Sequence, residues 1–197
     1  MAGDERDVVA LVLAGGAARR FGSDKTRADL NGRTVLARTV TQVAEVVERV
    51  VVIGPWAPDA VEQLDDPPPH RGPSSALAFG LRATDASWVL VVGGDHPLVR
   101  PALVELLVAR AVRGGADAVV PVRAGRDEPL LACYRATVGP VAGGLVDRGE
   151  LSMRAVPAAV VVDRVPEEVW RSVDPDGRSF LDVDTPEDLV AARRLLS

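Results

Sequence analysis

A short apolar run that leads directly into glycines and cations constrains the fold of this chain more than any other feature. Residues 8–13, Val-Val-Ala-Leu-Val-Leu, have the length and β-branched content of a buried strand. Glycines and cations then follow within a short stretch, among them Gly15, Gly16, Arg20, Gly22 and Lys25. Glycine lets backbone N–H groups approach an anion, and the two cations can neutralise phosphate oxygens. The stretch therefore predicts a strand that enters a loop binding a polyphosphate.

Neither of the commoner phosphate loops matches this stretch. A P-loop requires G-x-x-x-x-G-K-[ST], whereas two residues separate Gly22 from Lys25, and no G-x-G-x-x-G is present. Residues 13–25 instead read L-A-G-G-x-x-x-R-x-G-x-x-K. This pattern resembles the signature loop of the nucleotidyltransferases that activate sugars, polyols and cofactors, most closely that of the molybdenum cofactor guanylyltransferases. The alternative from the residues alone is a β-to-α turn whose cations are simply solvated.

Length and composition predict an α/β fold. The 197 residues suit a single domain spanning 1–197, with residues 1–7 flexible, and aromatic residues make up only 4%. The core must then consist of Val, Leu and Ala, as in parallel strands buried on both faces. We expect a Rossmann-like domain with a mostly parallel central sheet and helices on both faces. The resemblance implies the nucleotide-diphospho-sugar transferase variant of it.

The charge and the cysteine content exclude several classes of protein. A net charge of −5 disfavours a nucleic-acid coat or an anionic membrane as partner. The single Cys133 allows neither an intramolecular disulfide nor a cysteine metal cluster, and we expect it to be a buried structural thiol. The N-terminal segment lacks the pattern of a signal peptide, so a cytoplasmic location is expected.

The hydrophobic periodicity and the turn residues place the remaining elements. Asn31-Gly32 predicts a tight turn, and Ser74 is a candidate helix cap. We expect helices at 35–48, from Ser74 onwards, at 101–113, at 137–146 and from Thr185 to Leu196, a helical turn at 59–64, and strands at 49–53, 88–92, 117–122, 130–134, 158–163 and just before Thr185.

Asp95 is the second informative residue. It comes just past the predicted strand 88–92, at the sheet edge where ligands collect, and a carboxylate there can hold Mg²⁺ against substrate phosphates. The alternative is a turn or capping residue before Pro97. The resemblance favours the first reading, since the family motif of a strand followed by Asp-x-Pro is matched by Asp95 and Pro97.

The resemblance adds a second carboxylate and the substrate contacts. Asp182 and Asp184 occupy the places of two asparagines in the guanylyltransferases; Asp184 either completes the Mg²⁺ site or caps the last helix. Gly72 and Pro73 match the base pocket, with Asp65 or, as our choice, Asp66 as the acid that contacts guanine. Ser74-Ser75-Ala76 replaces the usual Leu-Ala-Gly and leaves the base preference open. Arg123, Arg126 and Arg154 are acceptor contacts or solvated loop charges.

The resemblance thus implies transfer of GMP from GTP to a phosphorylated pterin, molybdopterin, with Mg²⁺ as cofactor and release of pyrophosphate. The catalytic residues are Lys25, Arg20 and Asp95, the metal ligands Asp95 and Asp184, and the nucleotide contacts Leu13, Ala14, Gly15, Gly16, Arg20, Gly22, Lys25, Asp66, Gly72, Pro73 and Asp95. A cytidylyltransferase on the same pterin, a transferase with another phosphorylated acceptor and a catalytically silent nucleotide-binding module stay open. We expect a monomer or weak homo-oligomer that contacts cofactor-synthesis or recipient enzymes transiently.

Overall fold

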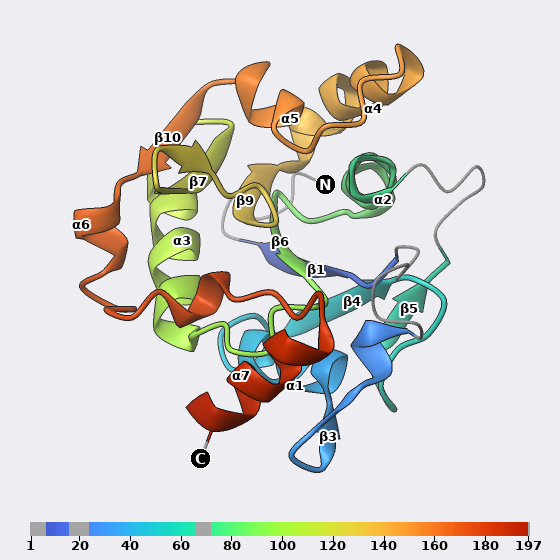
Figure 1. Cartoon of the computed structure of the whole chain (residues 1–197). Helices are drawn as coiled ribbons and strands as arrows, with labels where there is room; N and C mark the ends of the chain where they lie inside the picture. The colour runs from blue at the N-terminus through green and yellow to red at the C-terminus, as the bar shows by residue number, and fades with distance from the viewer. Residues whose placement is uncertain (1–6, 16–23, 66–71, 197) are drawn as a thin grey trace.

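A central mixed sheet carries the fold, in a computed structural model that describes residues 7–15, 24–65 and 72–196 (Figure 1). The strand order is β10-β7-β9-β6-β1-β4-β5, with β8 paired to β7. Only β8 and β9 run antiparallel to their described neighbours, which confirms a mostly parallel sheet. The strands are β1 (Val8–Leu13), β4 (Arg49–Ile53), β5 (Glu62–Leu64), β6 (Trp88–Gly93), β7 (Ala118–Arg123), β8 (Arg126–Asp127), β9 (Leu131–Arg135) and β10 (Val162–Val165).

Helices cover both faces of the sheet, as predicted. Alternate residues of β1 enter different cores: Ala10 and Val12 pack on one side, and Val9 and Leu11 on the other. The first core is closed by α1 (Val35–Ala44) and α3 (Pro101–Arg113), and the second by α2 (Pro73–Ala83), α4 (Gly139–Asp147) and α5 (Ala155–Ala158). In Figure 1, α2, α4 and α5 appear above the sheet and α1 below it.

A smaller cluster joins the end of the chain to its beginning. The hairpin of β2 (Asp29–Leu30) and β3 (Arg33–Thr34) turns at Asn31-Gly32, where both residues have positive φ, which confirms the predicted turn. Leu30 and Leu98 pack there against Leu189 of α7 (Pro186–Leu195). The last helix is thereby held next to the segment that follows β6.

Several sequence-based expectations about local structure are wrong. The predicted helical turn at 59–64 contains β5, which pairs in parallel with β4. The Arg49 guanidinium also joins the two strands by contacting both carboxylate oxygens of Glu62 at 3.0 Å, a contact between distant residues that periodicity cannot reveal. The helix predicted at 35–48 ends at Ala44 and is followed by a turn in which the amides of Val46 and Val47 both donate to the Val43 carbonyl.

The second half of the chain also differs in detail. Residues 158–163 do not form one strand: α5 includes Ala158, and β10 begins at Val162. The strand predicted just before Thr185 is absent: α6 (Glu167–Trp170) and the 3-10 turn Arg178–Phe180 lead into an irregular segment that continues to α7. That segment is held by a loop contact, the Val183 amide donating to the Asp95 carbonyl at 2.9 Å.

No helix within the described residues is long and apolar enough to cross a membrane. Residues 1–7 are predicted to be flexible, and 1–6 of them lie outside the described part of the chain.

Candidate active site

Three charged side chains from distant parts of the sequence meet beyond the ends of β1 and β6. Lys25 lies on the 3-10 turn Lys25–Arg27, Asp95 follows β6, and Asp184 directly precedes α7. The Lys25 Nζ lies 2.5 Å from Asp95 Oδ2 and 2.5 Å from Asp184 Oδ1. The structure therefore brings together the predicted catalytic lysine and both predicted metal ligands.

The electrostatics of this cluster favour a charged lysine. Burial by itself lowers the pKa of Lys25, but the charges of Asp95 and Asp184, together with hydrogen bonds to both, outweigh it and raise that pKa above its ordinary value. The exposed fractions of the Lys25 and Asp95 side chains are only 24% and 18%, so solvent screens their attraction incompletely. At neutral pH the cluster therefore contains a positively charged Lys25 beside the two carboxylates.

Gly93, the last residue of β6, and Gly94 after it let the Asp95 carboxylate reach this position. A Cβ on Gly93 would stand 2.6 Å from Asp95 Oδ1, and one on Gly94 would stand 3.2 Å from the Ala14 backbone. The Gly94 amide also donates to the Leu13 carbonyl at 2.9 Å. The end of β1 and the Asp95 turn therefore pack more closely than side chains would allow.

Asp184 is not the cap of α7. Thr185 is the N-cap and forms a capping box with Asp188, whose carboxylate also accepts the Asp184 amide at 3.1 Å. These hydrogen bonds lower the pKa of Asp188, and the one from the Thr185 hydroxyl has the largest effect. The Asp184 side chain is consequently free for the contact with Lys25.

The two carboxylates suit a divalent cation of the Mg²⁺ type. Asp95 Oδ2 and Asp184 Oδ1 each lie 2.5 Å from the one ammonium nitrogen and are therefore no more than about 5 Å apart, which allows both to reach a single cation. Within the described residues no group of three His, Cys, Asp or Glu side chains could hold a metal. A site of two carboxylates completed by substrate phosphates is the arrangement that Mg²⁺ commonly adopts.

The predicted phosphate loop is described only at its two ends. Leu13 and Ala14 are buried at the end of β1, and Gly15 follows them, partly exposed. Gly16, Arg20, Gly22 and Asp66 lie outside the described residues. The described part of the chain stops at Gly15, two residues after β1, and resumes at Asp24, directly before Lys25.

The start of α2 departs from the expected cap. Gly72, with φ +85°, is the N-cap, and Pro73 occupies the first turn. Ser74 is instead buried, and its hydroxyl donates to the Leu151 carbonyl at 2.6 Å. The replacement of Leu by Ser at this position thus links α2 to the segment before α5.

Sequence reasoning missed the residues that hold the turn containing Lys25. The Trp56 indole N–H lies 3.0 Å from Asp24 Oδ2 and 3.1 Å from Thr26 Oγ1, and Arg27 lies over the indole ring. The Asp24 side chain accepts the Thr26 amide and caps this turn. An Asp two positions before a Thr is a weak capping signal, and nothing local identifies Trp56.

A pocket of about 240 Å³ lies beside Asp95 and contains two of the three predicted acceptor arginines. Arg123 pairs with Glu128 at 2.8 Å, and the Arg154 Nε donates to the Asp127 carbonyl at 3.4 Å. Arg126 on β8 is exposed and does not line this pocket. The lining residues are His96, Arg123, Glu128, Pro129, Leu130, Ser152, Met153, Arg154, Phe180 and Asp182.

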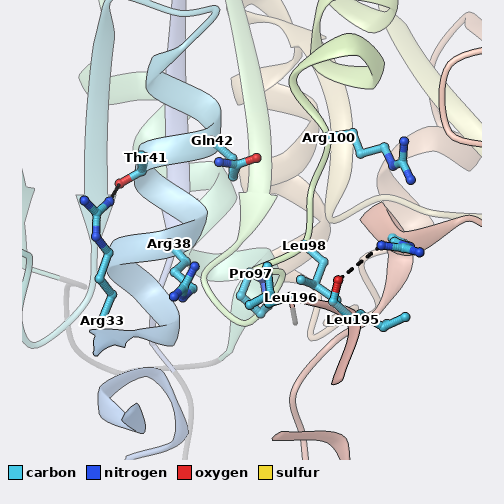
Figure 2. A pocket seen from close by; sticks show the side chains of 10 residues that line it. Arg33, Arg38, Thr41, Gln42, Pro97, Leu98, Arg100, Leu195 and Leu196 are labelled. Carbon is cyan, nitrogen blue, oxygen red and sulfur yellow. Dashed lines mark hydrogen bonds between the residues drawn. The ribbon is translucent and has the colours of Figure 1, made fainter. Parts of the chain in front are cut away.

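Two other features lie apart from this site. A second pocket, between α1 and the end of α7, is flanked by Arg38 on one side and Arg100 on the other, and none of the predicted site residues lines it (Figure 2). Arg100 there pairs with the buried Asp174 at 2.9 Å. Cys133 is buried, and burial raises the pKa of its thiol, so it is the structural residue expected and not a nucleophile.

Comparison with known proteins gives consistent results. Residues 10–163 match the family model described as the MobA-like NTP transferase domain. A probable molybdenum cofactor guanylyltransferase of Chloroflexus aggregans is 33% identical over 91% of this chain and 90% of its own length. The structure of molybdopterin-guanine dinucleotide biosynthesis protein A from Archaeoglobus fulgidus superposes with a TM-score of 0.81 at 25% identity, covering 96% of this chain and 98% of that one. A cytidylyltransferase from Thermus thermophilus, at 22% identity and a TM-score of 0.69, shares the fold.

Proposed function

This chain belongs to the MobA-like NTP transferase family, and from that premise we propose that it transfers GMP from GTP to molybdopterin and releases pyrophosphate. The observation that carries the proposal is the convergence of Lys25, Asp95 and Asp184 at the mouth of the predicted phosphate loop. A second support is the adjoining pocket, where Arg123 and Arg154 offer cations to a phosphorylated acceptor.

In the proposed reaction, an oxygen of the acceptor phosphate attacks the α-phosphorus of GTP. A new P–O bond forms to the acceptor, the bond between the α-phosphorus and its bridging oxygen breaks, and pyrophosphate carries away the electron pair. No protein nucleophile takes part, and a phosphate acceptor is already ionised at neutral pH. The protein contributes positioning and charge neutralisation.

Each residue of the site has a defined task in this proposal. Lys25 and Arg20 neutralise the phosphates, and the amides of Gly15, Gly16 and Gly22, after Leu13 and Ala14, cradle them. Asp95 and Asp184 would hold Mg²⁺, which when bound supplies further positive charge to the phosphates. Binding of the phosphates draws the Lys25 ammonium away from the two carboxylates, which frees both of them as ligands.

The base and the acceptor are assigned to different groups of residues. Asp66, Gly72 and Pro73 receive the guanine, and Arg123 and Arg154, which line the pocket, face the acceptor. Arg126 lies outside that pocket and has no part in the proposal. Because Ser74 is directed to Leu151, we infer that its hydroxyl does not contact the base and that its departure from the family pattern leaves guanine selection intact. We further propose one domain over 1–197, acting in the cytoplasm as a monomer or weak homo-oligomer that contacts its recipient enzymes transiently.

The proposal is tested by pyrophosphate release from GTP, CTP, ATP and UTP in the presence of Mg²⁺ and molybdopterin. Release with GTP alone, lost in Lys25→Ala and Asp95→Ala, supports it. Release with CTP would keep the mechanism and change the base. Binding of GTP without turnover, unaffected by Asp95→Ala, would identify a silent nucleotide-binding module.

A further inference from the structure

Trp56 contacts both neighbours of the candidate catalytic lysine, although it is no part of the charged cluster. It follows β4, and its partly buried ring packs against the core beneath α1. Its indole N–H is shared between Asp24 Oδ2 at 3.0 Å and Thr26 Oγ1 at 3.1 Å. Lys25 lies between these two residues in the chain, so Trp56 contacts the side chains on both sides of Lys25.

The remaining contacts of Asp24 and Arg27 complete this network. The other carboxylate oxygen, Asp24 Oδ1, accepts the Thr26 amide at 3.0 Å and the Thr26 hydroxyl at 2.6 Å. The Arg27 guanidinium lies 4.8 Å from the centre of the Trp56 ring. Every residue of the turn except Lys25 is therefore tied to Trp56 or to a partner of Trp56.

These contacts matter because the other anchors of Lys25 are the carboxylates assigned to the metal. Once the ammonium moves to the substrate phosphates, Asp95 and Asp184 no longer direct it. The hydrogen bonds of Trp56 involve neither carboxylate and can persist through that change. The direction of the lysine in the substrate complex then depends on the turn itself.

We propose that Trp56 is a positioning residue: its indole N–H fixes the Asp24–Arg27 turn so that Lys25 points at the nucleotide phosphates. This inference rests on the proposed function, because it assigns the phosphates of GTP to Lys25. The effect acts through Lys25 and therefore belongs to nucleotide binding and not to the acceptor side.

Trp56→Phe tests the inference by keeping an aromatic ring and removing the N–H. We expect the Kd for GTP, measured by calorimetry without acceptor, to rise about tenfold, as for the loss of a hydrogen bond to a charged partner. The kcat/KM for GTP falls equally, and the KM for molybdopterin is unchanged. Thr26→Val, which keeps the volume of Thr26 and removes the hydroxyl contacted by Trp56, changes the GTP affinity in the same direction.

Trp170→Phe is the matched control. It also removes an indole N–H, the one that donates to the Val122 carbonyl at 2.9 Å, but it does so outside the Lys25 turn. We expect it to lower the Tm without changing the Kd for GTP. A purely structural role of Trp56 would produce the same pattern in Trp56→Phe.

Fluorescence gives a second readout. Trp88 and Trp170 are fully buried, at 1% and 0% exposure, whereas Trp56 is partly exposed beside the loop. GTP should therefore change the emission of the wild type and of Trp170→Phe, and that change should be absent in Trp56→Phe.

Unaltered GTP affinity in both Trp56→Phe and Thr26→Val would overturn the inference, as would a nucleotide-dependent emission change that survives Trp56→Phe. These measurements need no turnover. A wild type that binds GTP and transfers nothing would contradict the proposed function alone. A wild type that does not bind GTP would contradict both.

Discussion

Removal of the lysine charge should turn the two carboxylates into a metal site even without nucleotide. In the wild type, the Lys25 ammonium lies 2.5 Å from an oxygen of Asp95 and of Asp184 and so competes with any cation for both. Lys25→Met removes this competitor and keeps most of the aliphatic chain. We therefore expect Mg²⁺ to stabilise Lys25→Met and to leave the wild type unchanged.

The size of this effect follows from binding linkage. If the two freed carboxylates bind Mg²⁺ with a Kd on the order of 1 mM, then about 10 mM Mg²⁺ adds about 1.4 kcal/mol to the stability. For a chain of 197 residues this corresponds to a rise in Tm of about 3 to 6 °C. Without Mg²⁺, Lys25→Met should be less stable than the wild type by about 1 to 3 kcal/mol, since two partly buried carboxylates lose their cation.

The assay is a thermal melt of metal-free protein with and without Mg²⁺, at constant ionic strength and without nucleotide. Lys25→Arg keeps the charge and should stay insensitive to Mg²⁺. Lys25→Met with Asp184→Asn lacks one ligand and should lose the gain. If Lys25→Met responds to Mg²⁺ no more than the wild type does, then Asp95 and Asp184 do not form the metal site, and the reasoning is refuted.

Three further predictions concern pH, the α2 contact and the cap of α7. Charges and hydrogen bonds that outweigh burial raise the pKa of Lys25 above 10.5, so its ion pairs should stabilise the fold fully below pH 10.5. The Tm advantage of the wild type over Lys25→Met should then vanish as the pH rises through that higher pKa, and an advantage that persists would contradict the ion pairs. Ser74→Ala should lower the stability by about 1 kcal/mol in denaturant melts and raise the KM for the acceptor more than that for GTP, because the Leu151 carbonyl loses its donor; equal effects on both KM values would speak against this link. Asp188→Ala should cost about 1 kcal/mol at neutral pH through loss of the capping box. Because the pKa of Asp188 is lowered from 3.8, that cost should disappear as the pH falls through the folded-state value, and a cost independent of pH would exclude the carboxylate as its source.

Local signals in the sequence predicted the elements that carry part of the candidate site. The strand before Gly15 and the position of Asp95 after β6 follow from apolar runs that end at glycines, and such runs are local signals. The placement of Asp184 near Asp95 came only from the family resemblance, and its contact with Lys25, 159 residues earlier, was not predicted. Periodicity carries no information about such a distant pair.

What the sequence did not reveal depends on contacts between distant segments. The three residues of β5 are too few for a period, and their strand exists because β4 offers an edge. Ser74 is a residue type that often caps helices, but its hydroxyl donates to the Leu151 carbonyl instead. Trp56 acquires its role from Asp24 and Thr26, about thirty residues earlier, and a single tryptophan in a loop gives no sign of that.

The most direct test of the proposed reaction follows the phosphorus atoms of GTP. The protein is incubated with molybdopterin, Mg²⁺ and GTP labelled at either the α- or the γ-phosphate, and the pterin product and the pyrophosphate are separated. Our account predicts that the α label appears in the pterin product and the γ label in pyrophosphate, with both transfers lost in Asp95→Ala. Transfer of the γ label to the pterin, or release of the γ label as inorganic phosphate with no labelled pterin, would contradict it.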